Sequence, residues 1–279
     1  MSGTPTGEHP AYVCGHAPRE FDRLAVQARI YEAVTRRLLV RAGIDAGQSV
    51  VDLGCGGGDV TLIAADAVGP TGTVTGVDRS AQAVAAAARR AAHLPHVRVV
   101  VGELDSWQPA EPVDAVIGRF VLMHQRDPAA LLAKVRGWLR PGGVVGFVES
   151  NNAACQPGMH SRPHSATYHG IVEVWQQVIR SAGAHLDMGA RLVDTFAAAG
   201  LPDPSAETDV YTSGDPESPI FRFAIESLRS MLPMAVAAAI AAPAEGDLDR
   251  LEATLRHEIA ASGGVLSAPP AHAVWARVE

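Results

Sequence analysis

The chain has 279 residues, a formal net charge of −7 and 47% hydrophobic residues. This size favours one large domain, or one domain with a substantial insertion, around a sizeable core. An acidic chain without a long Lys/Arg run is not expected to bind nucleic acid. Its three widely spaced cysteines predict neither a disulfide framework nor a zinc site.

The first half of the chain alternates helical and strand-like patterns. Residues 1–15 are rich in Gly, Pro and Thr, and a helix is expected from residue 20 up to Gly43. Ser80 and Asp127 are predicted to cap the helices that follow them. This alternation predicts a doubly wound α/β sheet. Its strands are expected at 48–53, 73–78, 97–101, 113–118 and 143–149.

After Glu149 the pattern becomes mostly helical. Residues 150–168 look like a loop, and helices are expected around 171–179 and 190–199. Strands are expected at about 207–212 and 270–277, with some 55 mostly helical residues between them that Pro233 is predicted to break. We interpret 1–42 as N-terminal lid helices and 43–150 as a cofactor-binding core. Residues 151–279 then complete the sheet and add a helical substrate cap from 151–186 and 214–264.

The most informative segment is residues 50–59, which read Val-Val-Asp-Leu-Gly-Cys-Gly-Gly-Gly-Asp. An apolar strand ends in glycines, and a helix begins at once. Such a turn lets a ligand contact bare backbone near unpaired N–H groups. About twenty residues later a second apolar strand ends in Asp78, whose carboxylate is placed to accept both hydroxyls of a ribose. The pair predicts an adenosine-type cofactor.

The spacing of the glycines helps to choose that cofactor. A dinucleotide-binding turn carries G-x-G-x-x-G. Gly54 and Gly56 fit this pattern, but Asp59 takes the place of the third glycine. An anionic side chain there is a poor neighbour for a pyrophosphate and a tolerable one for a sulfonium and an ammonium. The turn therefore favours S-adenosyl-L-methionine (SAM) over a nicotinamide dinucleotide.

This turn closely resembles the first motif of class I SAM-dependent methyltransferases. Further stretches match that family in order over roughly residues 20–150: 76–80, 101–105, 114–119 and 139–143. The likeness is to ubiquinone/menaquinone-type and secondary-metabolite methyltransferases. It implies a Rossmann-like, mostly parallel seven-stranded sheet, with SAM as cofactor and S-adenosyl-L-homocysteine (SAH) as product.

The resemblance also assigns candidate cofactor residues. Arg79 follows the ribose-binding aspartate, and Glu103 or Asp105, beside Leu104, would meet the adenine. Arg119 would contact the methionine carboxylate or the substrate, or else pair with a structural acid. Helix residues Arg23 and Gln27, with Tyr12, would close over SAM or form an ordinary solvated face. The candidate cofactor-binding set is Gly54, Cys55, Gly56, Asp78, Arg79, Glu103, Leu104, Arg119, Gln27 and Tyr12.

His124 is the candidate general base. It follows the fourth strand in a stretch that resembles the substrate pocket of small-molecule methyltransferases. A histidine of unperturbed pKa near ~6.5 suits proton abstraction from a hydroxyl, although a lone histidine is more often structural. His160, His164 and His169 lie in or near the loop without an obvious carboxylate set, so we expect pocket lining rather than metal binding. The candidate substrate-binding residues are His160, His164, Tyr168 and Trp175.

The sequence thus predicts a SAM-dependent methyltransferase acting on the oxygen, nitrogen or carbon of a small molecule, in secondary metabolism. One rival is a SAM-binding enzyme of the same fold that does not methylate, and another is an NAD-dependent oxidoreductase. No signal peptide and no apolar stretch long enough for a bilayer are visible. We therefore expect a cytoplasmic monomer or homodimer with no membrane partner.

Overall fold

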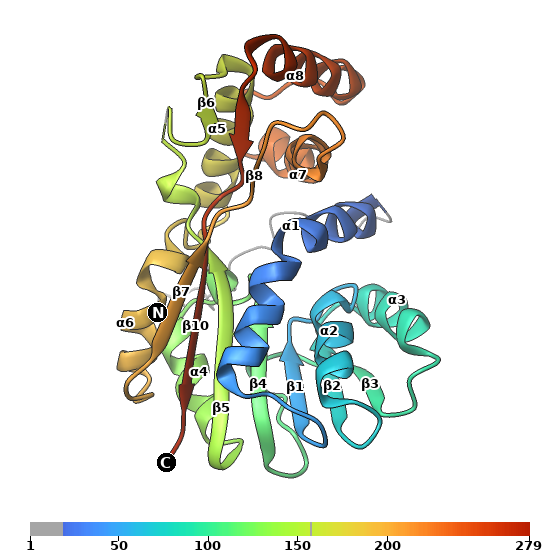
Figure 1. Ribbon diagram of the computed structural model, residues 1–279, viewed down its shortest axis with the longest axis vertical. Coiled ribbons are helices and arrows are strands. Elements are labelled where there is room, and N and C mark those ends of the chain that lie inside the picture. The colour runs from blue at the N-terminus through green and yellow to red at the C-terminus, as the bar shows by residue number, and fades with distance from the viewer. Residues whose placement is uncertain (1–18, 157) are drawn as a thin grey trace, which may run out of the picture.

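The computed structural model describes residues 19–156 and 158–279. A seven-stranded sheet in the order β3-β2-β1-β4-β5-β10-β7 forms its lower part (Figure 1). Strands β1 to β5 pair in parallel, and β10 lies antiparallel between β5 and β7. This confirms the expected mostly parallel seven-stranded sheet. The strands are β1 Ser49–Leu53, β2 Thr73–Asp78, β3 Val97–Val101, β4 Val113–Arg119, β5 Leu139–Ser150, β7 Ser205–Asp209 and β10 Ala271–Arg277.

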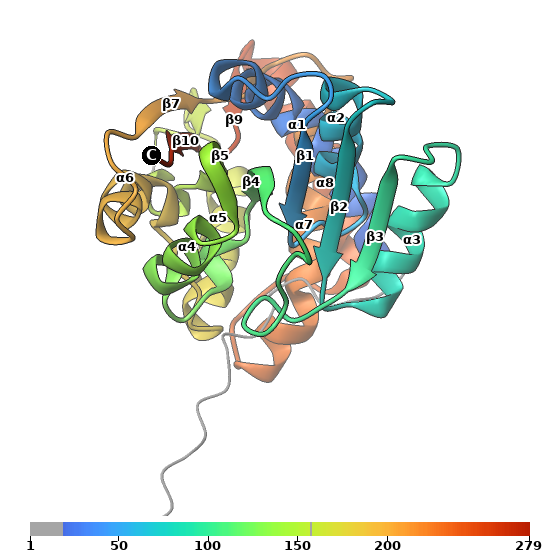
Figure 2. The same ribbon diagram turned by 90° about the horizontal axis from the view of Figure 1, so that it is seen from below.

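Helices cover both faces of this sheet (Figure 2). Helices α1 and α2 contact each other on one face, and α4 and α6 contact each other on the other. The predicted caps are confirmed: Ser80 Oγ accepts the N–H of Ala83 at 3.2 Å, and Asp127 Oδ1 accepts the N–H of Ala130 at 2.9 Å. These helices are α1 Arg19–Ala42, α2 Asp59–Val68, α3 Ala81–Ala91, α4 Pro128–Arg136 and α6 Met188–Ala198.

A second layer lies beyond one end of the sheet, at the top of Figure 1. It consists of helices α5, α7 and α8 with a small antiparallel sheet in the order β6-β9-β8, and we call it the helical layer. Helix α7 contacts α1, α5 and α8, so it joins this layer to the rest of the molecule. Its elements are α5 Ala166–Ser181, α7 Pro219–Ala237, α8 Leu248–Ser262, β6 Ser161–Arg162, β8 Thr212–Ser213 and β9 Val265–Ser267.

The expected break at Pro233 is wrong. Helix α7 runs through Pro233 to Ala237 and buries one continuous stripe that includes Leu228, Met231 and Ala235. Tertiary burial on both sides of the proline outweighs the one backbone hydrogen bond that it removes. No described helix is both long and apolar enough to cross a membrane.

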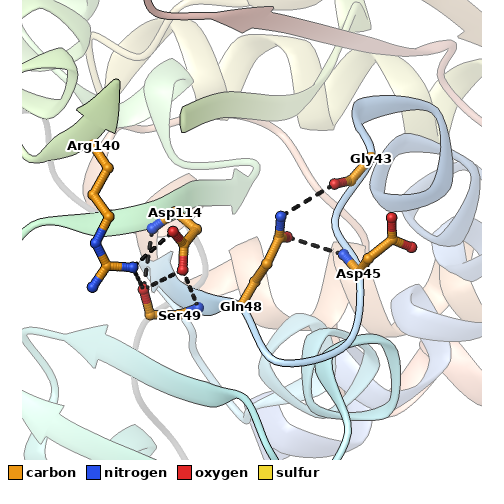
Figure 3. Close-up of polar contacts among 6 residues, drawn as sticks. All are labelled: Gly43, Asp45, Gln48, Ser49, Asp114 and Arg140. Carbon is orange, nitrogen blue, oxygen red and sulfur yellow. Dashed lines mark hydrogen bonds and ion pairs between the residues drawn. The ribbon is translucent and has the colours of Figure 1, made fainter. Parts of the chain in front are cut away.

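One acidic side chain links the amino ends of three inner strands, on the side of the sheet away from the helical layer (Figure 3). Asp114, at the start of β4, accepts the N–H of Ser49 at 2.7 Å and a hydrogen bond from Arg140 Nη1 at 2.7 Å. Three neighbouring strands are thereby joined at their amino ends. Burial alone would raise the pKa of Asp114, but the hydrogen bonds from Ser49 and Arg140 lower it. Asp114 thus stabilises the amino ends of these strands, whereas the cavity described below lies at the other ends.

Candidate active site

The turn after β1 exposes bare backbone to a cavity of about 230 Å³. Gly54 and Gly56 adopt φ of +63° and +51°, in the left-handed region that favours glycine. A Cβ on Gly54 would lie 2.7 Å from Cγ2 of Val121, so packing also requires glycine there. Gly54, Cys55 and Gly56 all line the cavity. A ligand in it would meet backbone rather than side chains along this wall.

Asp78 lies beside this turn at the carboxyl end of β2. Its Oδ2 accepts the N–H of Gly56 at 2.9 Å, and its Oδ1 accepts the N–H of Ser80 at 2.8 Å. Asp78 and Arg79 both line the cavity. The acidic strand end and the glycine turn, 22 residues apart in the chain, are therefore in direct contact.

The segment after β3 supplies another wall. Glu103, Leu104 and Asp105 all line the cavity. The backbone carbonyls of Leu104 and Asp105 accept hydrogen bonds from Lys134 Nζ at 2.9 and 2.6 Å. Helix α4 thus holds this segment in place, and the N–H of Gly102 just before it donates to the carbonyl of Asp78 at 2.9 Å.

Two arginines and a glutamine from α1 and β4 bring further polar groups to the cavity. From α1, Arg23 Nη1 donates to Gln27 Oε1 at 2.6 Å, and both residues line the cavity. At the end of β4, Arg119 Nη1 donates to Thr35 Oγ1 at 3.1 Å. Burial lowers the pKa of Arg119, while Asp59 and Asp52 oppose the shift. This cationic wall suits an anionic group, such as a carboxylate. Tyr12 lies outside the described residues.

His124 also lines the cavity, in a single 3-10 turn at Leu122–His124. Its expected pKa near ~6.5 is wrong. Burial lowers the pKa of His124 to about 4, and the nearby charges of Arg79 and Arg23 act in the same direction. The imidazole is therefore neutral at physiological pH, free of a ring charge but only weakly basic.

Glu149, at the end of β5, holds the turn that carries His124. Its Oε1 accepts the N–H groups of Val121 and Leu122 at 2.8 and 2.7 Å, and its Oε2 accepts that of Met123 at 3.4 Å. Burial raises the pKa of Glu149 to about 8, although these three donors oppose the shift. Glu149 is not among the cavity-lining residues, so its contacts make it a positioning residue.

The helical layer closes the cavity with mostly apolar side chains. Trp175 and Ile179 from α5 line it, as do Phe223, Ser227 and Met231 from α7. The three α7 residues recur every four positions and so share one helix face. Sequence reasoning named Trp175 but missed the α7 residues. Their i, i+4, i+8 spacing indicates in the sequence that they share a helix face, but it does not indicate which element that face contacts.

Three of the predicted substrate-binding residues do not line this cavity, which corrects that expectation. Tyr168 is fully buried, and its hydroxyl donates to the carbonyl of Ser267 at 3.1 Å. His160 stacks on His169 with ring centroids 5.5 Å apart, and His164 lies 5.6 Å from His169. Tyr168 thus packs against β9, and His160 and His164 pack against His169 of α5. Over residues 19–156 and 158–279, no group of three or more His, Cys, Asp or Glu could hold a metal ion.

The part of the chain from β1 to the start of β5 matches a known domain family. Residues 50–143 match a family model described as a methyltransferase domain. That match includes the glycine turn, Asp78, the segment after β3 and the turn of His124. The glycine turn with Asp78 fits SAM, the cofactor that the sequence predicts.

Named relatives match about half of the chain. A trans-aconitate 2-methyltransferase from Azoarcus sp. is 39% identical over 117 residues, which cover 42% of this chain and 45% of that protein. A demethylmenaquinone methyltransferase from Staphylococcus aureus is 29% identical over 136 residues, covering 48% and 56%. The chain thus spans about half the length of the curated relatives that it matches.

Solved structures extend the likeness over most of the chain. Phosphoethanolamine N-methyltransferase 2 from Haemonchus contortus, in complex with phosphomonomethylethanolamine and S-adenosylhomocysteine, matches with a TM-score of 0.52 at 17% identity. The match covers 92% of this chain and 52% of that one. At this identity the likeness concerns the fold alone.

Proposed function

We propose that this protein transfers a methyl group from SAM to the oxygen, nitrogen or carbon of a small molecule, in secondary metabolism. One observation carries the proposal. A single cavity is lined on one side by Gly54, Gly56 and Asp78, and on the other by Trp175 and Phe223 of the helical layer. A polar cofactor wall and an apolar wall thus face the same space, as a reaction between cofactor and organic acceptor requires.

Each group of polar residues that lines the cavity has a role in binding SAM. The Gly54–Gly56 backbone receives the amino-acid part of SAM, and Asp78 accepts the ribose hydroxyls. Arg119 or Gln27 binds the methionine carboxylate. Glu103 or Asp105, beside Leu104, accepts from the adenine amino group. When bound, SAM supplies a methyl group on a positively charged sulfur that leaves readily.

The protein then contributes mainly alignment. The helical layer is the substrate cap and α1 is the lid, so both hold the acceptor in line and exclude water. Orientation of this kind can supply ~7–11 kcal/mol. For a hydroxyl acceptor, a ring nitrogen of His124 takes the proton. Because the pKa of His124 is about 4, this step suits an acidic hydroxyl best.

The names of the relatives agree with a small acceptor. They include a trans-aconitate 2-methyltransferase and a demethylmenaquinone methyltransferase, and by analogy we extend that size of acceptor to this chain. The proposal also includes a cytoplasmic monomer or homodimer that acts without nucleic acid or membrane.

Two measurements test the proposal. Calorimetric titration should give saturable binding of SAM and SAH and none of NAD. Incubation with SAM and a small-molecule extract should then yield SAH with an equal amount of a product heavier by one methylene, seen by mass spectrometry. SAM binding with no SAH formed across extracts would favour a SAM-binding enzyme that does not methylate, and NAD binding alone would favour an oxidoreductase.

A further inference from the structure

Two polar atoms in the helical layer are buried without a partner. Trp175 Nε1 and Ser227 Oγ have no hydrogen bond to any described residue, and both residues line the cavity. The two residues are 3% and 4% exposed. They come from different helices, α5 and α7, so one feature of a single helix does not explain both.

Such atoms are unusual in a packed protein. A buried donor normally finds a partner, because leaving it without one is costly. A serine inside a helix has a hydrogen-bond partner close by, because its hydroxyl can donate to the backbone carbonyl four residues earlier. The hydroxyls of Thr195 and Thr254 do so, donating to the backbone carbonyls of Arg191 and Arg250 at 2.8 and 2.9 Å. Ser227 makes no such bond.

Aromatic residues line the same cavity. Trp175 and Phe223 lie edge to face with ring centroids 5.7 Å apart, and Tyr31 and Phe223 do so at 6.0 Å. Phe120 meets Tyr31 edge to face at 4.8 Å. All four residues line the cavity. Aromatic rings favour further rings in stacked or edge-to-face contact.

We infer that the acceptor has a flat aromatic body and carries a carbonyl oxygen or a similar hydrogen-bond-accepting oxygen that meets Trp175 and Ser227. The direction of the bonds follows from chemistry: an indole N–H can only donate, so its ligand partner must accept. Ser227 can donate as well, because a hydroxyl carries one O–H. This inference rests on the proposed function, because it describes the acceptor end of the same cavity.

Three probes of nearly equal shape separate the two parts of the inference. 2-Acetylnaphthalene has the flat body and the carbonyl, 2-isopropylnaphthalene lacks the carbonyl, and 2-acetyldecalin lacks the aromatic rings. Equilibrium dialysis of the full chain at saturating SAH gives the Kd of each. The variants are Ser227→Ala and Trp175→Phe, which remove one donor each. The matched controls are Ser230→Ala on α7 and Trp138→Phe, outside the cavity lining.

We expect the wild-type protein to bind 2-acetylnaphthalene about fivefold or more tightly than either analogue. Ser227→Ala and Trp175→Phe should each weaken binding of the ketone about fivefold and leave that of 2-isopropylnaphthalene unchanged, while both controls keep the wild-type values. Equal affinity for the ketone and the isopropyl probe, equal losses on both probes, or binding of none of the three would overturn the inference.

The proposed function fails by a different result. Titration of the wild-type protein with SAH comes first, and absence of binding there would overturn the proposed function itself. If SAH binds and the probes are not distinguished, the inference about the acceptor fails and the proposed function stands. Ser227→Ala removes only the hydroxyl oxygen and so is expected to fold. It tests whether the acceptor's oxygen bonds to this cavity even if Trp175→Phe does not fold.

Discussion

The carboxylate of Glu149 accepts the backbone N–H of Leu122 at 2.7 Å. This bond ties the end of β5 to the turn that carries His124. Val121, one residue earlier, packs where a Cβ on Gly54 would otherwise lie. One buried carboxylate therefore supports two parts of the cavity wall, and its protonation should influence the stability of the whole protein.

Stability should fall as pH rises above 6.5. Glu149 has a pKa of about 8 when folded against 4.5 when unfolded, so the folded state keeps a proton that the unfolded state loses. Between pH 6.5 and 8 this costs at most ~2 kcal/mol at 1.36 kcal/mol per pH unit. Asp52, with a pKa of about 7, acts in the same direction. Thermal unfolding across this range measures the effect.

The variant Glu149→Gln should flatten that pH dependence, since an amide does not titrate. It should also lower the melting temperature at pH 6.5, because its amide oxygen can accept from Val121 and Leu122 but its NH₂ group cannot accept the N–H of Met123. Glu111→Gln, at an exposed position, is the control and should keep the wild-type slope. A wild-type melting temperature that is constant from pH 6.5 to 8 would count against a proton on Glu149.

His124→Ala tests the base. If His124 accepts the proton, kcat should fall by ~10²–10⁴-fold with SAM affinity nearly unchanged. The wild-type rate should stay level as pH drops through 6.5 and decline only towards the pKa of about 4, because the ring must be neutral to accept. His257→Ala, on the exposed face of α8, is the control. A variant with near-normal kcat and the same pH profile would leave alignment alone as the source of rate.

Asp78→Ala should weaken SAM binding roughly ten- to a hundredfold. Hydrogen bonds to a charged group contribute ~1.5–3 kcal/mol, and Asp78 also holds the N–H of Gly56. Calorimetry gives the Kd, with Asp194→Ala on the exposed face of α6 as the control. An unchanged Kd would remove Asp78 from the cofactor site.

Gly56→Val should abolish SAM binding while leaving the sheet formed. Valine is strained at φ +51°, and its side chain would enter the cavity near Leu24. Gly142→Val is the matched control: its φ of +79° brings similar strain, but no described atom lies within 4 Å of a Cβ there. Circular dichroism checks the fold of both. Full SAM affinity in folded Gly56→Val would refute the glycine-turn assignment.

The alternation of strands and helices up to residue 150 was readable from the sequence, because each element there has a local signal. The small sheet β6-β9-β8 was not, since its strands are two or three residues long and come from distant segments. The break predicted at Pro233 was wrong for the same reason. The local effect of a proline is known from sequence, but the packing of α7 against α1, α5 and α8 that outweighs it is not.

For the site, the sequence by itself determined the polar wall. Gly54, Gly56 and Asp78 could be named because a strand, a tight turn and a strand end are properties of short stretches of backbone. Tertiary structure alone decided which side chains complete the cavity. It brought Phe223 and Ser227 to it, placed Tyr168 and His160 elsewhere, and lowered the pKa of His124. The burial of a side chain, and whether it points into the cavity, depend on segments far apart in the chain, so no local sequence pattern predicts them.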